Sequence, residues 1–146
     1  MPAITPDQLK ELDFGYLTGA DLCDYVADAL LISRYQIDDT KFIRGAKTAY
    51  SYVLNKVSTR YDCTAEILKT GDARDFTLVK IMALHAIDNI MGNIQGLSTR
   101  TQNELNWAKS AIMEIRTEQL SLQLPNATAL LISPAYIVSQ SFGTLG

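Results

Sequence analysis

The longest regular pattern in the chain is a stripe of apolar residues that begins shortly after position 40. Its members recur at steps of three and four residues, the spacing of one face of an α-helix. They are Ile43, Ala46, Tyr50, Val53, Leu54, Val57 and Tyr61. Asp39 and Thr40 precede the stripe and are residue types that cap helix N-termini. The pattern predicts a helix over residues 40–60 with Asp39 or Thr40 as its cap.

A second segment, residues 76–94, is apolar on almost every side of a helix. A polar turn precedes it, so Asp75 or Phe76 should begin the helix. Gly92 and Gly96 should end it, because glycine is a poor helix former and a common residue at helix C-termini. A helix without a polar face is typical of the centre of a core or of an oligomer.

Three further segments have the helical period. Residues 101–104 match the S/T-x-x-E capping box, so a helix should run from Thr101 to about Gln119. Residues 21–33 predict another helix, and residues 5–12 a short one. No alternation of apolar and polar residues, the mark of a strand, persists before position 125. The predicted fold class is all-α, a small bundle of four to five helices with an extended C-terminal arm.

The last 22 residues, 125–146, break this pattern. Two prolines and two glycines exclude a long helix, yet the segment is too apolar for a solvated tail. Its large apolar residues include Leu130, Leu131, Ile132, Tyr136, Ile137, Val138 and Phe142. We therefore divide the chain into a helical body, residues 1–124, and an uncharged arm. A disordered tail, an arm packed on its own body and an arm docked on a neighbour stay open, and we favour the last.

Composition places the chain among ordinary globular proteins. It has 146 residues, 47% hydrophobic and 20% charged, with a mean hydropathy of +0.03. No apolar run approaches the roughly 20 residues that cross a bilayer, and the first residues do not resemble a secretion signal. We expect a soluble, intracellular protein with no membrane partner. Cys23 and Cys63 lack CxxC spacing and are expected to be reduced.

The formal net charge of −3 conceals a strong segregation. Residues 1–40 carry a net −6, residues 41–60 carry +5, residues 61–124 carry −2, and the arm carries none. Solvated faces are the plainest explanation of each run. The alternative is self-association, in which acids of one copy meet bases of the next. On this basis, the candidate contact residues are Lys41, Arg44 and Lys47, together with the seven apolar residues of the arm named above.

No arrangement of residues predicts catalysis, a metal or a cofactor. His85 is the single histidine, and a zinc site needs three or four ligands, so we expect a structural histidine. Cys63 has no surrounding motif. Residues 71–75 lack the glycines and lysine of a phosphate loop and are expected to form a turn and a helix cap. We therefore expect no enzyme.

Four short motifs, in order, resemble a known family. They are Ala49-Tyr50-x-x-Val53-x-x-x-x-Ser58-x-x-Tyr61-Asp62, Gly71-Asp72-x-Arg74-Asp75-x-Thr77-Leu78-Val79-Lys80-Ile81, Leu105-x-Trp107-Ala108 and Leu122-x-Leu124-Pro125. Over residues 18–125 the chain resembles the small helical head–tail connector proteins of tailed phages and prophages, most of all the Mu-like prophage branch. Phe76 departs from the proline of many relatives.

The resemblance implies a helical bundle that assembles as a ring, usually of twelve copies, below the portal. Such a ring extends the DNA channel and offers a platform to a stopper or tail protein. The implied partners are other copies of the chain, the portal protein, a stopper or tail completion protein, and DNA that passes without sequence specificity. The implied location is the virion neck, after synthesis in the host cytoplasm. The family brings no catalytic residues.

Two expectations qualify this picture. Because DNA should slide past a channel wall without sticking, acidic residues of 1–40 or 61–75 should line the channel, and Lys41, Arg44 and Lys47 should not. The alternative function is a small DNA-binding packaging or regulatory protein, which the basic segment 41–60 would serve. A pI near 5.0 and the absence of an arginine-rich run argue against it. An uncharacterised small enzyme is a third, unsupported alternative.

Overall fold

A computed structural model describes residues 4–92 and 97–126 of the chain. These residues form six α-helices and two short 3-10 helices, and no strand occurs among them. The α-helices are α1 Pro6–Lys10, α2 Gly19–Cys23, α3 Asp28–Ile37, α4 Asp39–Val57, α5 Phe76–Met91 and α6 Thr99–Arg116, and the 3-10 helices are η1 Glu66–Leu68 and η2 Gly71–Ala73. The predicted all-α bundle is confirmed. Within the same segments, no helix combines the length and the apolarity of a membrane span.

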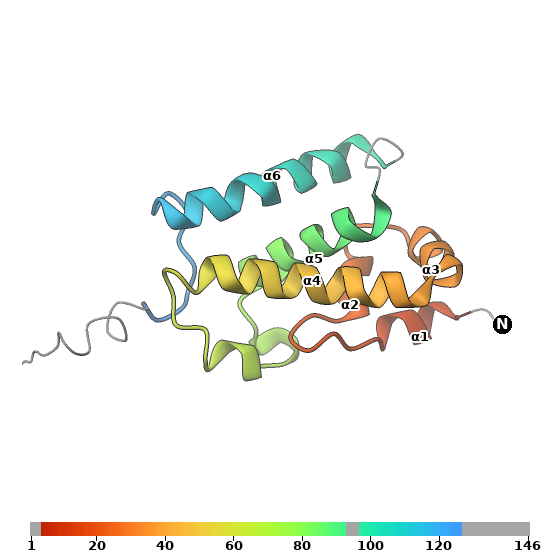
Figure 1. Ribbon diagram of the computed structural model, residues 1–146, viewed down its shortest axis with the longest axis horizontal. Coiled ribbons are helices and arrows are strands. Elements are labelled where there is room, and N and C mark those ends of the chain that lie inside the picture. The colour runs from red at the N-terminus through yellow and green to blue at the C-terminus, as the bar shows by residue number, and fades with distance from the viewer. Residues whose placement is uncertain (1–3, 93–96, 127–146) are drawn as a thin grey trace, which may run out of the picture.

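Helix α5 is the centre of the core. It lies between α4 and α6 and packs against both (Figure 1). Its buried residues point in all directions around the helix, as expected for a segment with no polar face: Leu78, Ile81, Met82, Ala83, Leu84, Ala86, Ile87, Ile90 and Met91. It begins after Asp75, whose Oδ1 accepts a hydrogen bond from the Leu78 N–H at 2.9 Å, and ends at Gly92, where φ is +72°. Both predicted ends are confirmed.

Helix α4 follows the predicted stripe but ends at Val57, three residues before the predicted end at residue 60, and its cap and buried line also differ from the prediction. Its cap is Asp38, whose Oδ1 accepts from the Lys41 N–H at 3.0 Å, so neither Asp39 nor Thr40 caps it. Asp38 has an extended backbone, which places its carboxylate in front of the first free N–H groups. The fully buried line runs through Phe42, Ala46, Ala49, Val53 and Val57, and the predicted Ile43, Tyr50 and Leu54 lie half-buried beside it.

Helix α6 begins two residues before the predicted capping box. Ser98 is the cap, with its Oγ accepting from the Thr101 N–H at 3.2 Å. Glu104 does not reach back to complete a box. Instead it lies 3.5 Å from Lys80 of α5 and 3.5 Å from Arg100. The helix ends at Arg116, three residues before the expected Gln119.

The predicted helix over residues 21–33 is wrong, because the chain breaks there into α2 and α3. Thr18 and Asp21 form a capping box that starts α2, and the Asp21 carboxylate is also bound by Arg74. At the break, Val26 turns into the core, and the free Tyr25 carbonyl accepts a hydrogen bond from Thr101 Oγ1 at 3.1 Å. Contacts from distant parts of the chain therefore outweigh the local helical pattern. The break brings the number of α-helices in the described part of the chain to six.

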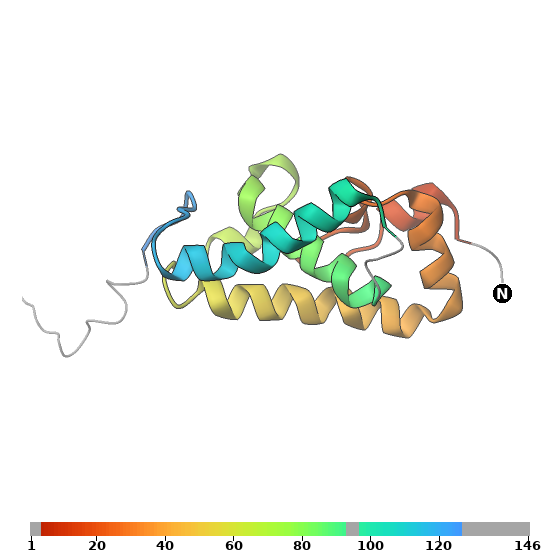
Figure 2. The ribbon, with the colours of Figure 1, turned by 90° about the horizontal axis from the view of Figure 1, so that it is seen from above.

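The three short helices gather at one end of the bundle. Helix α1 packs against both α2 and α3. Seen from above, α4 forms one long edge of the molecule, whereas α1 and α2 lie towards the other edge (Figure 2). Two sides of the bundle are thus formed by different parts of the sequence: α4 forms one, and the other includes residues 4–25 together with the loop that carries η1 and η2 (Figure 2).

Candidate interaction surface

The motif Gly71-Asp72-x-Arg74-Asp75 serves the fold. The Arg74 guanidinium binds the Asp21 carboxylate at 2.6 and 2.9 Å, and it also donates to the Tyr16 carbonyl and the Gly71 carbonyl, both at 2.8 Å. Gly71 has a φ of +58°, a backbone conformation that favours glycine. The side chains of Arg74 and Asp21 are only 11% and 10% exposed. As expected, residues 71–75 are a turn and a cap, and they also anchor the N-terminal segment.

A second group of contacts surrounds the buried Glu66. The Tyr16 hydroxyl and the Asp75 N–H, the latter at 2.6 Å, donate to Glu66 Oε2, and Lys69 lies 3.1 Å from Oε1. Burial alone would raise the pKa of Glu66, but these hydrogen bonds outweigh it and hold the pKa below its usual value. Burial and the hydrogen bond to Glu66 raise the pKa of the Tyr16 hydroxyl. These contacts connect the segment that holds Tyr16, the short helix η1 with Lys69 after it, and Asp75 at the start of α5.

His85 and the cysteines also have contacts of a structural kind. The His85 Nε2 lies 3.2 Å from the Ala108 carbonyl, and its ring centroid is 5.6 Å from that of Tyr52. Burial lowers the pKa of His85. Neither cysteine forms a disulfide, and burial followed by a hydrogen bond to Asp28 raises the pKa of Cys23 to about 12. Burial likewise raises the pKa of Cys63. In the described part of the chain, no group of three or more His, Cys, Asp or Glu is placed to hold a metal ion.

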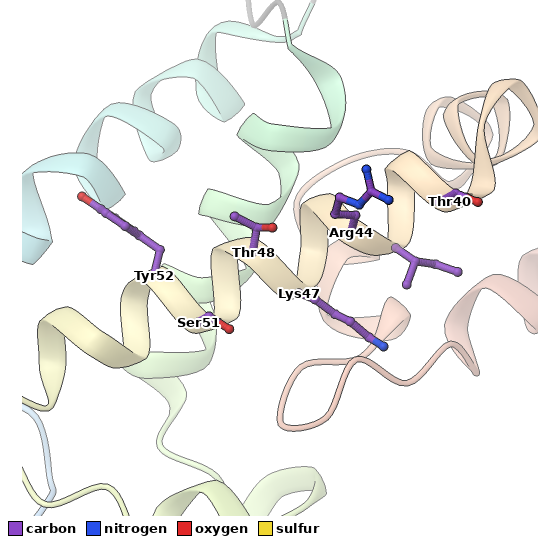
Figure 3. A pocket seen from close by; sticks show the side chains of 7 residues that line it. Thr40, Arg44, Lys47, Thr48, Ser51 and Tyr52 are labelled. Carbon is purple, nitrogen blue, oxygen red and sulfur yellow. The ribbon is translucent and has the colours of Figure 1, made fainter.

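The candidate interaction surface is a groove of about 670 Å³ on the outer face of α4. The described residues that line it all belong to this helix: Thr40, Ile43, Arg44, Lys47, Thr48, Ser51 and Tyr52. Arg44, Thr48 and Tyr52 project on one side of α4, whereas Lys47 projects on the other (Figure 3). The surface combines two cations, four hydroxyl groups, one of them on the aromatic ring of Tyr52, and an aliphatic side chain. Such a mixture suits a large polar or protein partner.

The cations of residues 41–60 differ in their partners. Lys41, Arg44 and Lys47 are exposed, and no carboxylate of residues 4–92 or 97–126 lies within 4.0 Å of them. By contrast, Arg60 pairs with Glu118 at 3.3 Å and donates to the Ile115 carbonyl at 2.9 Å. We call Lys41, Arg44 and Lys47 the basic face. The structure therefore leaves three of the five bases of segment 41–60 on an open surface and ties Arg60 to the core.

The apolar candidates of the arm lie outside the described residues: Leu130, Leu131, Ile132, Tyr136, Ile137, Val138 and Phe142. The first two arm residues are described and lie against the body. The Asp62 N–H donates to the Pro125 carbonyl at 2.8 Å, and Asn126 forms an isolated antiparallel bridge with Tyr61. Residues 125 and 126 thus lie just beyond the C-terminal end of α4. The division into a body and an arm stays a prediction.

The sequence identified the charges of this surface but not its other members. Thr48, Ser51 and Tyr52 were not singled out, although they follow from the same helical period as the buried stripe, on its opposite side. Comparisons with protein-family models, with curated proteins and with solved structures found no match for this chain. A functional conclusion must therefore start from the residues and contacts described above.

Proposed function

We propose that this chain is a structural protein of a tailed-phage or prophage virion, a head-to-tail adaptor that forms a ring below the portal. The observation that carries the proposal is the groove on α4. A basic face with no acidic partner within residues 4–92 and 97–126 lies on one edge of a tightly packed helical bundle. A small domain with a well-packed core and one open, charged edge suits a subunit that completes its contacts with other proteins.

The residues that carry the resemblance to connector proteins support a scaffold role. Arg74 and Asp75 hold the loop between α4 and α5. Tyr61, from the first motif, accepts a hydrogen bond from the Leu122 N–H at 3.0 Å, and Leu122 belongs to the last motif. Leu105 and Ala108 are buried in α6. The residues of these motifs therefore hold the helices of the bundle together. A family that has no catalytic residues would be expected to share such structural contacts.

The proposal includes the following finer points. The ring contains about twelve copies, sits in the virion neck after synthesis in the host cytoplasm, contacts the portal protein and a stopper or tail completion protein, and catalyses no reaction. DNA passes through its channel without sequence-specific contact. Asp21 and Glu66 are buried, so the channel wall would draw on other acidic residues of 1–40 or 61–75, such as the exposed Asp72.

Negative-stain microscopy of the purified full chain, alone and mixed with its portal protein, tests the proposal. Ring-shaped particles, either free or seated on portal rings, are the expected result. A chain that stays monomeric with the portal protein present would contradict the adaptor function.

The DNA-binding alternative is favoured by one feature of the same surface. Cations and hydroxyl groups are the side chains that usually contact nucleic-acid phosphates, and Arg44, Lys47, Thr48 and Ser51 lie together on α4. If this function were correct, the chain would bind duplex DNA with an affinity that falls steeply as salt rises, and Arg44→Glu with Lys47→Glu would abolish the binding. The adaptor function predicts little or no such binding.

A further inference from the structure

The basic face lacks an anionic partner among the described residues of its own chain, and the same chain carries an acidic surface elsewhere. Residues 1–40 contain eight acids. The structure shows which of them have other roles. Asp21 binds Arg74, Asp38 caps α4, and Asp13 accepts a hydrogen bond from the Gly15 N–H at 2.8 Å. Asp39 belongs to the first turn of α4 and is half-buried.

The remaining four acids lie on or next to helices α1, α2 and α3, and Lys10 belongs to α1. They are Asp7 and Glu11 at α1, Asp24 after α2 and Asp28 in α3. Of the four, Asp28 is half-buried and also hydrogen-bonds Cys23. Helices α1, α2 and α3 pack together, and the Lys10 Nζ lies 3.9 Å from Asp28 Oδ2. We call Asp7, Glu11, Asp24 and Asp28 the acidic edge. With Lys10 included, four carboxylates and one ammonium group give it a net charge of −3, which matches the three positive charges of the basic face.

The two surfaces are held apart within one molecule. Helix α4 forms one long edge of the bundle, and α1 and α2 lie towards the other (Figure 2). A rigid body with complementary charges on two different sides associates with copies of itself in a head-to-tail manner. Repetition of such a contact closes a ring when the rotation per copy divides a full turn, and otherwise it builds a filament.

We propose that the acidic edge of one copy binds the basic face of the next copy, and that the contact forms at the groove on α4. The partner of the groove is thus a second copy of this chain. The inference rests on the proposed function, to which it adds the pair of surfaces that would repeat around the ring. Opposite charges would set the register of the contact, and Ile43 and Tyr52 would supply its apolar part.

Charge reversal on each surface tests the proposal. The first variant is Arg44→Glu with Lys47→Glu, and the second is Asp7→Lys with Glu11→Lys. All four positions are exposed, so neither variant should disturb the core. Sedimentation velocity of the full chain, over a range of concentrations and salt, measures self-association. Each variant alone should weaken it roughly a hundredfold, because like charges then face each other.

Mixing the two variants gives the decisive comparison. In an equimolar mixture every contact between unlike copies again joins opposite charges, so association should return to near the wild-type level. The variant with all four substitutions should also associate. Lys109→Glu with Arg116→Glu makes the same change of charge at exposed positions of α6 and should leave association unchanged. Circular dichroism confirms that each variant keeps its helices.

Three results would overturn the inference. Reversal variants that associate like the wild type would show that other surfaces join the copies, and the inference would then fail. The proposed function would still hold if microscopy showed rings. A mixture that fails to recover would show that the two surfaces do not meet each other. A wild-type chain that stays monomeric at every concentration would exclude the contact, and the separate experiment with the portal protein would then decide the adaptor function.

Discussion

At the scale of single residues, the ion pair between Arg74 and Asp21 has the clearest role. Its two hydrogen bonds join residues 53 positions apart in the sequence, and both side chains are almost buried. An ion pair of this kind adds little stability compared with a well-packed apolar pair, but removal of one partner leaves a buried charge without compensation. Arg74 also satisfies two backbone carbonyls, so its loss exposes further unpaired groups.

Arg74→Ala should therefore lower the free energy of unfolding by about 3 kcal/mol. Urea denaturation at neutral pH measures the change. Arg116→Ala, at an exposed position of α6, serves as the matched control and should cost less than about 0.5 kcal/mol. A loss below about 1 kcal/mol in Arg74→Ala would contradict the structural role of the network.

His85 gives a prediction about pH because it is the only histidine in the chain. Burial lowers its pKa in the folded protein below the usual 6.5, so the unfolded chain binds the proton more readily. Stability is therefore fully present above about pH 6.5 and should decline as the pH falls below that value towards the lower pKa of the folded state.

Denaturation curves between pH 7 and pH 5.5 should show this decline in the wild type, and His85→Gln should remove it. The comparison uses the slope with pH, so a constant loss from the missing Ala108 contact does not affect it. Equal slopes in the two proteins would show that His85 titrates normally.

At the scale of elements, the sequence predicts the helices whose determinants are local. Helices α4 and α5 depend on apolar periods and on neighbouring caps, and both were located within a few residues. The break between α2 and α3 depends on Arg74 and Thr101, which lie far away in the sequence, so no local pattern reveals it. The start of α6 was misplaced because Ser98 and Thr101 are both good caps, and Lys80 takes the carboxylate that a capping box would need.

Gly19, at the start of α2, tests how closely the short helices pack. A Cβ atom at this position would lie 1.8 Å from the Leu9 carbonyl oxygen, and the Gly19 N–H donates to the Leu12 carbonyl at 2.9 Å. Because the clash is with backbone, Gly19→Ala should cost about 3 kcal/mol or prevent folding.

Gly45→Ala, in α4, is the matched control. Its Cβ would lie 3.3 Å from Cγ1 of Ile90, a side-chain atom that can move, and alanine favours a helix over glycine. The net effect on the free energy of unfolding should stay within about 1 kcal/mol. Thermal unfolding of both variants measures the difference, and similar stabilities would show that α1 and α2 are not as close as described.

At the scale of the whole molecule, charge segregation in the sequence becomes two separate surfaces. The sequence predicted that Lys41, Arg44 and Lys47 would form a contact surface, because a run of bases without acids can be recognised from the order of residues alone. It could not show which acids remain available, since this depends on tertiary partners such as Arg74 for Asp21. Nor could it show that the two surfaces lie on different sides of the bundle (Figure 2). The proposed head-to-tail contact combines the placement of these surfaces with their charges.

The central claim is that this chain works as a repeated subunit of a ring. Native mass spectrometry of the full-length chain tests it most directly, because the method counts the copies in each particle. The account predicts one dominant closed oligomer, near twelve copies, that dissociates as salt is raised. A chain that remains monomeric over the whole range of concentration and salt, and does so also with its portal protein present, would contradict the account.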